Sequence, residues 1–210
     1  GKTRVLTHRI AYLIAEKNVK PWNIIAITFT NKAAKEMKNR IENLVGTECA
    51  NDIWIGTFHS MCVRILRREI TKIGYNSDFV IFDTSDVRTV IKECIKELNL
   101  DDKIYSDRYL AYEFSKAKNE LITVDRYANM YASDTRMSTV ARAYQLYQSK
   151  LIKNNALDFD DIINNTIKIF EENADVLEVY QNKFQYILVD EYQDTNKAQD
   201  KLIMLLGDVH

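Results

Sequence analysis

Apolar positions at helical spacing alternate with short unbroken apolar runs along the first 72 residues. The helical spacing predicts amphipathic helices over residues 4–17, 32–45 and 58–73. The apolar runs at residues 23–29 and 52–57 are typical of strands buried on both faces, as in a parallel sheet covered by helices. The alternation of helix and strand therefore indicates an α/β domain.

Capping residues set the expected ends of these helices. Asn31 is the expected N-cap of the second helix, because its side chain can accept a hydrogen bond from a free backbone N–H group. Gly46 and Gly74 suit the left-handed turns that end helices. The chain has 5 glycines and 1 proline among 210 residues, whereas the two together make up about 12% of average proteins. Turns are therefore few, and most of the chain should be helical.

The pattern changes after Gly74. Residues 79–82 form a brief extended piece, and helices then dominate as far as residue 155. These helices have serine, threonine or aspartate at their expected starts, namely Asp83 or Ser85, Ser106 and Thr123, and a longer helix covers Arg136–Lys153. Residues 73–155 are therefore predicted to be a helical domain inserted into an α/β domain formed by residues 1–72 and 156–210.

The α/β pattern resumes after residue 155. Asp158 is the expected N-cap of a helix that runs to Phe170, and a second helix covers residues 174–183. The apolar run at residues 185–190 predicts another buried strand. Thr195 is expected to begin a final helix that reaches residue 206.

Charge is distributed unevenly along the chain, although the net charge is only −1. Residues 1–72 carry a net charge of +7, residues 73–155 are neutral, and residues 156–210 carry −8. The overall balance argues against a basic protein that wraps nucleic acid. A basic segment opposite an acidic one fits a polyanion site beside a metal site, and it equally fits two segments that neutralise each other in the fold.

The apolar runs and the cysteines of the sequence indicate the cellular compartment in which the protein is expected. No run of about 18 apolar residues is present, so no membrane segment is expected. The three cysteines, Cys49, Cys62 and Cys94, have neither paired spacing nor a CxxC motif. This usage favours a reducing interior, and we expect a cytoplasmic protein.

Two short segments carry candidate nucleotide chemistry. Gly1-Lys2-Thr3 matches the end of the phosphate-binding loop GxxxxGK[ST], in which lysine reaches the phosphates and the hydroxyl binds Mg²⁺. Asp190 and Glu191 follow an apolar strand. A carboxylate at the carboxyl end of a strand can hold Mg²⁺, and its neighbour can accept a proton from the attacking water. Each segment alone is weak evidence for a nucleotide site, because chance tripeptides and solvated acidic pairs are common.

Five segments, in order, resemble the motifs of the UvrD/PcrA/Rep-type superfamily-one DNA helicases. They are Gly1-Lys-Thr-Arg4, Ala26-Ile-Thr-Phe-Thr-Asn-Lys-Ala-Ala34, Gly56-Thr-Phe-His-Ser60, Leu157-Asp-Phe-Asp-Asp161 and Val189-Asp-Glu-Tyr-Gln-Asp-Thr-Asn196. The resemblance covers nearly the whole chain, including the helical insertion. It implies an incomplete RecA-like domain of the P-loop NTPase class, with a parallel sheet, from an ATP-dependent helicase that moves 3′ to 5′ on single-stranded DNA.

The resemblance also implies roles for individual residues. ATP would be bound by Gly1, Lys2, Thr3 and Arg4, and Mg²⁺ by Thr3 and Asp190. Glu191 resembles the catalytic base, and Gln193 the residue that couples nucleotide state to the DNA site. Single-stranded DNA would be contacted by two groups, namely Thr28, Phe29, Thr30 and Asn31, and Thr57, Phe58 and His59. DNA-repair or replication proteins would be further partners.

Alternatives remain open for several of these residues. Phe29 and Phe58 suit core packing, His59 suits a buried hydrogen-bonded site, and N-capping explains at least one of the three aspartates at positions 158, 160 and 161. The family's adenine-reading glutamine, second motor domain and arginine fingers do not occur in this sequence, so the chain resembles a helicase fragment that cannot unwind DNA alone. An inert DNA- or protein-binding fragment and the motor half of a helicase–nuclease are the competing hypotheses.

Overall fold

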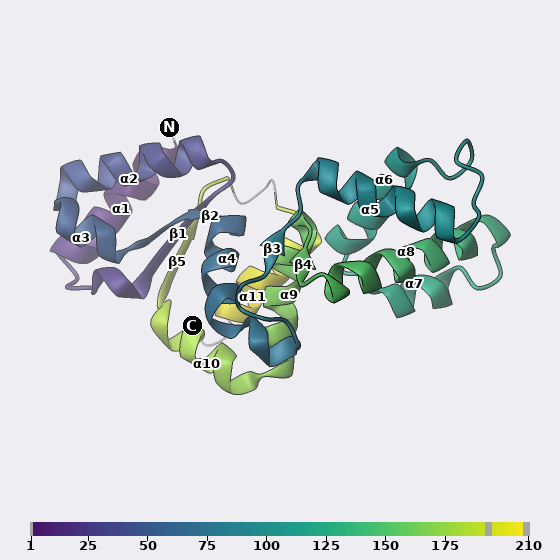
Figure 1. Ribbon diagram of the computed structural model, residues 1–210. Coiled ribbons are helices and arrows are strands. Elements are labelled where there is room, and N and C mark those ends of the chain that lie inside the picture. Colours follow the sequence, from purple (N-terminus) through teal and green to yellow (C-terminus); the bar gives the residue numbers. More distant parts are fainter. Residues whose placement is uncertain (1, 192–194, 208–210) are drawn as a thin grey trace.

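A three-stranded parallel sheet forms the centre of the first lobe in the computed structural model, which describes residues 2–191 and 195–207 (Figure 1). Its strand order is β2–β1–β5, with β1 at Ile24–Thr28, β2 at Trp54–Thr57 and β5 at Tyr186–Val189. Both strand pairs are parallel, so the carboxyl ends of all three strands meet at one edge. The predicted α/β domain with a parallel sheet is confirmed, although the chain as a whole is mostly helical.

Helices cover both faces of this sheet because the first four residues of β1 are apolar on both sides of the strand. Ile24 and Ala26 pack into one core cluster with α1 (Lys2–Ala15), α2 and α3. Ile25 and Ile27 face the opposite way and pack into a larger cluster with the remaining helices of the lobe. All five residues of β1 are buried, as expected for a strand buried on both faces. Besides α1, the sheet lobe contains the helices α2 (Asn31–Val45), α3 (Thr47–Asp52), α4 (Phe58–Glu69), α9 (Phe159–Glu172), α10 (Ala174–Lys183) and α11 (Lys197–Gly207). It also contains the one-turn helices η1 (Pro21–Asn23) and η2 (Ile70–Ile73).

Three local expectations differ from the structure. The N-cap of α2 is Thr30 rather than Asn31, because the Thr30 hydroxyl accepts the hydrogen bond from the Ala33 N–H group at 3.0 Å. Asp52 ends the short helix α3 and does not begin a strand. Gly46 serves as the C-cap of α2 and the N-cap of α3 with a φ of 93°, so one left-handed residue joins two helices where a single helix end was expected.

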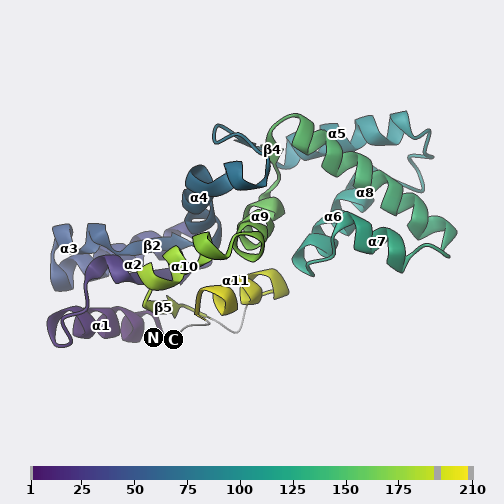
Figure 2. The ribbon, with the colours of Figure 1, turned by 90° about the horizontal axis from the view of Figure 1, so that it is seen from below.

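A second lobe consists of helices with a core of its own (Figure 2). Its helices are α5 (Thr84–Glu97), α6 (Asp107–Asn119), α7 (Val124–Met130) and α8 (Thr135–Lys153). The chain enters and leaves this lobe through a short parallel pair, β3 (Val80–Ile81) and β4 (Ala156–Leu157), of which β4 was not anticipated. No described helix is both long and apolar enough to cross a membrane.

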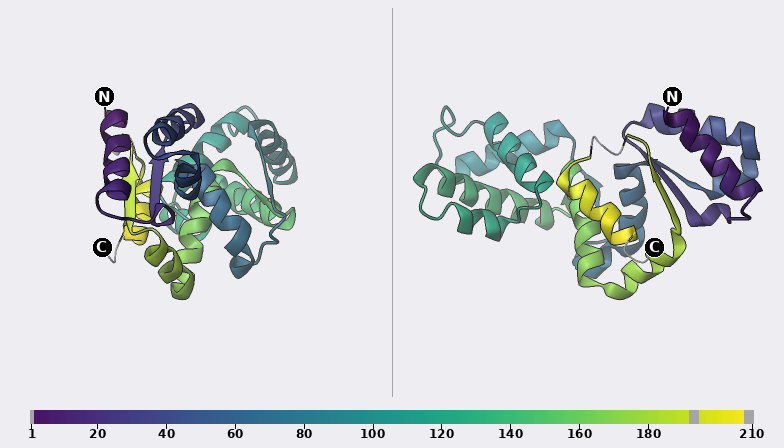
Figure 3. Two further views of the ribbon diagram at one scale, coloured as in Figure 1. Left: turned by 90° about the vertical axis from the view of Figure 1, so that its left-hand side faces the viewer. Right: turned by 180° about the vertical axis from the view of Figure 1, so that it is seen from behind.

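A buried ionic network joins the two lobes. Lys118 of α6 donates to Asp158 Oδ2 at 2.6 Å, and its ammonium lies 2.9 Å from Asp161 Oδ1. The Tyr147 hydroxyl of α8 donates to the same Asp158 oxygen at 2.8 Å, and Gln148 donates to Asp161 at 3.0 Å. Lys118 and both aspartates are buried. Side chains of the helical lobe therefore converge on the first turn of α9, which belongs to the sheet lobe. Figure 3 shows the ribbons of the two lobes from two further sides.

The far edge of β5 gives a testable property of the isolated chain. Within the described residues β5 pairs only with β1, and its other edge faces a hollow of about 460 Å³ beside α1. Unpaired strand edges template association with further strands. We expect the purified 210-residue chain to self-associate in sedimentation velocity. A sharp monomeric melt at high temperature would show that this edge is protected in solution.

Candidate nucleotide and DNA site

The first turn of α1 meets the residue that follows β5 at the carboxyl edge of the sheet. Thr3 in the first turn of α1 donates its hydroxyl hydrogen bond to Asp190 Oδ2 at 2.8 Å. Asp190 follows the last residue of β5, and its backbone N–H donates to the Ile27 carbonyl at 2.9 Å, which extends the ladder between β1 and β5. The side chain of Asp190 is therefore fixed by the sheet, and it is 7% exposed. A hydroxyl and a carboxylate 187 positions apart thus form one site.

The hollow between α1 and β5 adjoins this pair. Its lining includes Lys2, Arg9, Asp190 and Glu191. Glu191 has a φ of 57°, a left-handed conformation that is uncommon for residues other than glycine. Such backbone strain of order 1–3 kcal/mol concentrates at functional sites. Lys2 and Glu191 are exposed next in sequence to Thr3 and Asp190, so the hollow carries an ammonium group and a carboxylate beside this pair.

The donor set suits Mg²⁺ better than a transition metal. Thr3 and Asp190 offer hard oxygen ligands, and Mg²⁺ is commonly held by one or two protein oxygens while substrate phosphates and water complete its shell. No described group of three or more His, Cys, Asp or Glu residues could hold a metal alone. A site with few protein ligands is therefore compatible with a metal that arrives with its phosphates.

The first candidate DNA group lies where β1 leads into α2. The Thr28 hydroxyl is buried and donates to the Thr30 carbonyl at 3.1 Å, so it shapes the turn. Thr30 and Asn31 are exposed at the start of α2. Phe29 is half-buried, and its ring centroid lies 5.6 Å from that of Phe58.

The second candidate DNA group lies where β2 leads into α4. Thr57 is the N-cap of α4 and forms a capping box with Ser60. A Cβ atom at Gly56 would collide with the Ser60 and Met61 side chains, so a larger residue here would displace the Ser60 hydroxyl of the capping box. Phe58 is 1% exposed and packs in the larger core cluster, so its ring supports Phe29 and offers no free face.

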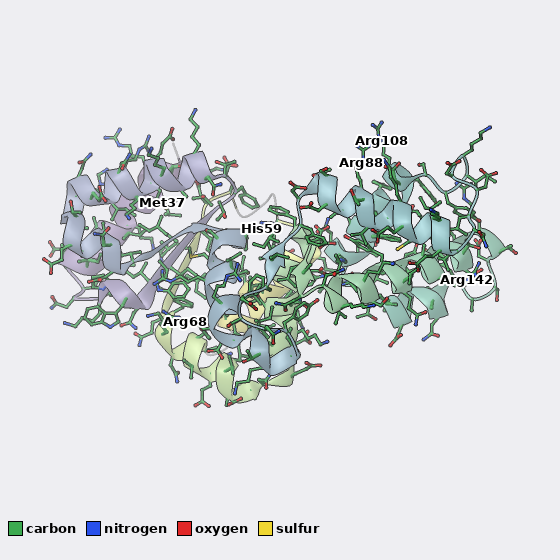
Figure 4. All side chains as sticks on the ribbon, viewed as in Figure 1. Met37, His59, Arg68, Arg88, Arg108 and Arg142 are labelled. Atoms are coloured by element: carbon green, nitrogen blue, oxygen red, sulfur yellow. The ribbon has the colours of Figure 1, made fainter. Side chains whose placement is uncertain are left out.

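His59 is the most accessible ring of that second group, and it is stacked on Phe159. The two ring centroids lie 3.5 Å apart with an interplanar angle of 15°. Burial lowers the pKa of His59 to about 4, although a hydrogen bond to the Phe159 backbone works in the opposite direction. His59 is therefore neutral near pH 7. Figure 4 shows His59 at the junction of the two lobes.

Phe159 is a candidate that the sequence did not suggest. Its side chain is 58% exposed although it is the first residue of α9 and large apolar residues usually bury. Its ring lies against His59, beside the carboxyl edge of the sheet. An exposed ring stacked on a half-buried one is a suitable platform for a nucleic-acid base.

The remaining residues singled out from the sequence divide into three groups. Arg4 is exposed in the first turn of α1, and its carbonyl accepts the Thr7 hydroxyl at 2.9 Å. Its role near the nucleotide stays a prediction. Gly1 and Gln193 lie outside the described residues. Of the aspartates in the fourth motif, Asp158 caps α9 and Asp161 completes its capping box, as N-capping predicted for at least one of them.

A helix-covered parallel sheet with a hydroxyl–carboxylate pair at its carboxyl edge defines a partial RecA-like α/β domain. The chain belongs to the UvrD/REP helicase family, because the model of that family's N-terminal domain matches residues 1–210. The expected family is thereby confirmed.

Curated relatives agree with this assignment. The chain is 57% identical over 208 residues to a protein of Bacillus subtilis named ATP-dependent DNA helicase PcrA. It is 57% identical over 207 residues to the protein of that name from Staphylococcus epidermidis, and 56% identical over 207 residues to that from Staphylococcus aureus. In each comparison 99% of this chain is covered, but it spans only 28% of the relative's length.

Proposed function

We propose that this chain contributes the first motor-domain segment of an ATP-dependent DNA helicase, which moves 3′ to 5′ on single-stranded DNA. The hydrogen bond of 2.8 Å between the Thr3 hydroxyl and Asp190 carries the proposal. It joins the end of a phosphate-loop motif to a strand-end carboxylate, the two protein ligands that nucleotide-bound Mg²⁺ has in P-loop NTPases. The relatives named ATP-dependent DNA helicase support the same reaction class.

Each residue of the nucleotide site has a definite task in this proposal. Thr3 and Asp190 hold Mg²⁺, which neutralises phosphate charge when bound. The Lys2 ammonium attracts the β- and γ-phosphates. The Glu191 carboxylate orients the attacking water and accepts its proton. Arg4 and Gly1 are further proposed nucleotide-binding residues, and Gln193 is the residue proposed to couple the nucleotide to the DNA groove.

Single-stranded DNA occupies the carboxyl edge of the sheet in this proposal. Hydroxyl and amide groups at Thr30 and Asn31 are exposed and can bind phosphates. His59 and Phe159 offer stacked rings for a base, with Phe29 nearby. We further propose that the protein acts in the cytoplasm beside DNA-repair or replication proteins, because its cysteines are free and its relatives are DNA helicases.

Truncating the aromatic residues tests the DNA groove. In the full-length protein we expect Phe29→Ala, His59→Ala and Phe159→Ala each to weaken binding of labelled oligothymidylate by roughly 1–3 kcal/mol, measured by fluorescence anisotropy. His59 is neutral, so His59→Ala should leave the salt dependence of binding unchanged.

Tyr12→Ala is the matched control for these variants, because Tyr12 is an exposed ring on α1 with 51% exposure. Circular dichroism must show an intact fold, since truncation of a packed ring also creates a cavity. If the three variants lost stability but kept their DNA affinity, these rings would serve packing and the groove would lie elsewhere.

A further inference from the structure

Three cations surround one buried indole at the amino-terminal edge of the sheet. Trp54, the first residue of β2, is 2% exposed. The Arg64 guanidinium carbon lies 3.7 Å from the centroid of the Trp54 ring. Lys183 Nζ lies 5.6 Å and the Arg68 guanidinium carbon 5.9 Å from the same ring. Arg64, Arg68 and Lys183 are called the cationic cluster below.

Among the residues that the structure describes, no carboxylate forms an ion pair with the cationic cluster. Every ion pair found among the described residues involves another cation. Arg68 bonds the Tyr180 hydroxyl, and Glu69 lies near that tyrosine without pairing with the cluster. Burial, followed by the charges of Arg64 and Arg68, lowers the pKa of Lys183. The three cations therefore repel one another, and a bound anion would relieve that repulsion.

An exposed tryptophan lies next in sequence to a residue that is hydrogen-bonded to the backbone of Lys183. Trp22 in η1 is 48% exposed. The next residue, Asn23, donates its side-chain amide to the Lys183 carbonyl at 2.8 Å, which ties η1 to the end of α10. Tryptophan and arginine are the residue types most enriched among the energetically dominant positions of protein–protein interfaces. The surface thus combines unpaired positive charge with an apolar anchor.

This surface lies away from the candidate DNA groove. His59 is in the first turn of α4 and Arg68 in its last turn, so nine residues of helix, about 14 Å, separate them. Figure 4 shows the two labelled side chains at opposite ends of that helix. A strand bound at the carboxyl edge of the sheet would not use the cationic cluster.

We propose that Trp22 and the cationic cluster form a docking surface for an acidic segment of a partner protein. Carboxylates of the segment meet Arg64, Arg68 and Lys183, and an apolar side chain packs on Trp22. The three cations converge on a single ring and do not follow a track. This compact arrangement fits a few carboxylates better than the evenly spaced charges of a nucleic-acid backbone.

Binding of a defined acidic peptide tests this proposal. The probe is a fluorescein-labelled peptide of repeated Glu-Glu-Leu units, added to the full-length protein and followed by anisotropy. We expect the double variant Arg64→Gln/Arg68→Gln to weaken binding at least about ten-fold. Lys183→Glu should weaken it independently, and Trp22→Ala should weaken it without changing its salt dependence.

Arg108→Gln/Arg142→Gln is the matched control, because both arginines are exposed on the helical lobe and make no described ion pair. It should change the peptide affinity by less than about two-fold. Circular dichroism confirms that each variant is folded. The proposal is overturned if the cluster variants bind the peptide normally, or if they lose affinity for oligothymidylate instead. Failure of the full-length protein to bind the peptide would also overturn it, because the surface would then be covered by the rest of that protein.

Discussion

Replacing Glu191 by glutamine in the full-length protein is expected to stop DNA-stimulated ATP turnover while nucleotide binding persists. Glutamine keeps the shape of the side chain but cannot accept a proton from water, and a positioned general base contributes about 10²–10⁴-fold to a rate. The Thr3–Asp190 pair is untouched by this change, so the metal ligands remain. Lys2→Ala removes the charge that attracts the phosphates, and it should abolish turnover and weaken binding together.

Phosphate release measures ATP turnover, and titration with a fluorescent ATP analogue measures nucleotide binding, so the two effects can be separated. Glu172→Gln on the exposed side of α9 is the matched control, because it makes the same chemical change away from the site. It should turn over ATP at the normal rate. Normal turnover by Glu191→Gln would remove Glu191 from the mechanism, whereas loss of nucleotide binding by that variant would assign it a structural role.

The centre of the sheet could be predicted from the sequence because its signal is local. Residues 24–27 are apolar without interruption, and a strand with that pattern must be covered on both faces. The order of the strands is not a local property. The pairing of β5 with β1 brings Asp190 to Thr3, and the residues alone placed each of them only at the end of an element. The family resemblance supplied the connection.

Phe159 was not predicted as a site residue, because its spacing from the next apolar residues of the helix wrongly indicates a buried position. It precedes Ile162 and Ile163 at the intervals that mark one apolar helix face, and both of those residues are buried. A helix begins beyond the core it packs against, so its first apolar residue can be left in solvent. The structure places that ring against His59, 100 positions earlier in the chain. Only the three-dimensional contact makes it a candidate for DNA stacking.

Lys118 escaped prediction for a related reason. Lys116 and Lys118 look alike as polar residues near the end of a helix, yet Lys116 is exposed and Lys118 is 2% exposed. From the sequence, N-capping was the expected role of at least one of the aspartates at positions 158, 160 and 161, and no ion pair with Lys118 was expected. Asp158 and Asp161 do form the capping box of α9, and the same carboxylates also bind the lysine. One pair of side chains therefore performs a local and a long-range task.

Replacing Lys118 by methionine is expected to lower the free energy of unfolding by about 3–5 kcal/mol, because two carboxylates would stay buried without their cation. In the native protein burial opposes the charge of Lys118, but Asp161 and Asp158 outweigh it and raise the pKa of Lys118. Urea unfolding followed by circular dichroism measures the loss. Lys116→Met is the matched control on the same helix, and it should stay within about 0.5 kcal/mol of the native protein.

The pH dependence of the free energy of unfolding distinguishes the loss of an ion pair from the loss of packing in Lys118→Met. Burial raises the pKa of Asp161 to about 6, and Lys118 limits that rise. Without Lys118 the pKa rises further above the unfolded value of about 3.9. A carboxyl group with a raised folded pKa binds protons more readily in the folded state, so Lys118→Met should regain stability as the pH falls from about 8 towards 4. In the native protein the lowered pKa of Asp158 opposes this trend. The stability difference between the two proteins should therefore narrow in acid, and a difference that stayed constant with pH would attribute the loss to packing alone.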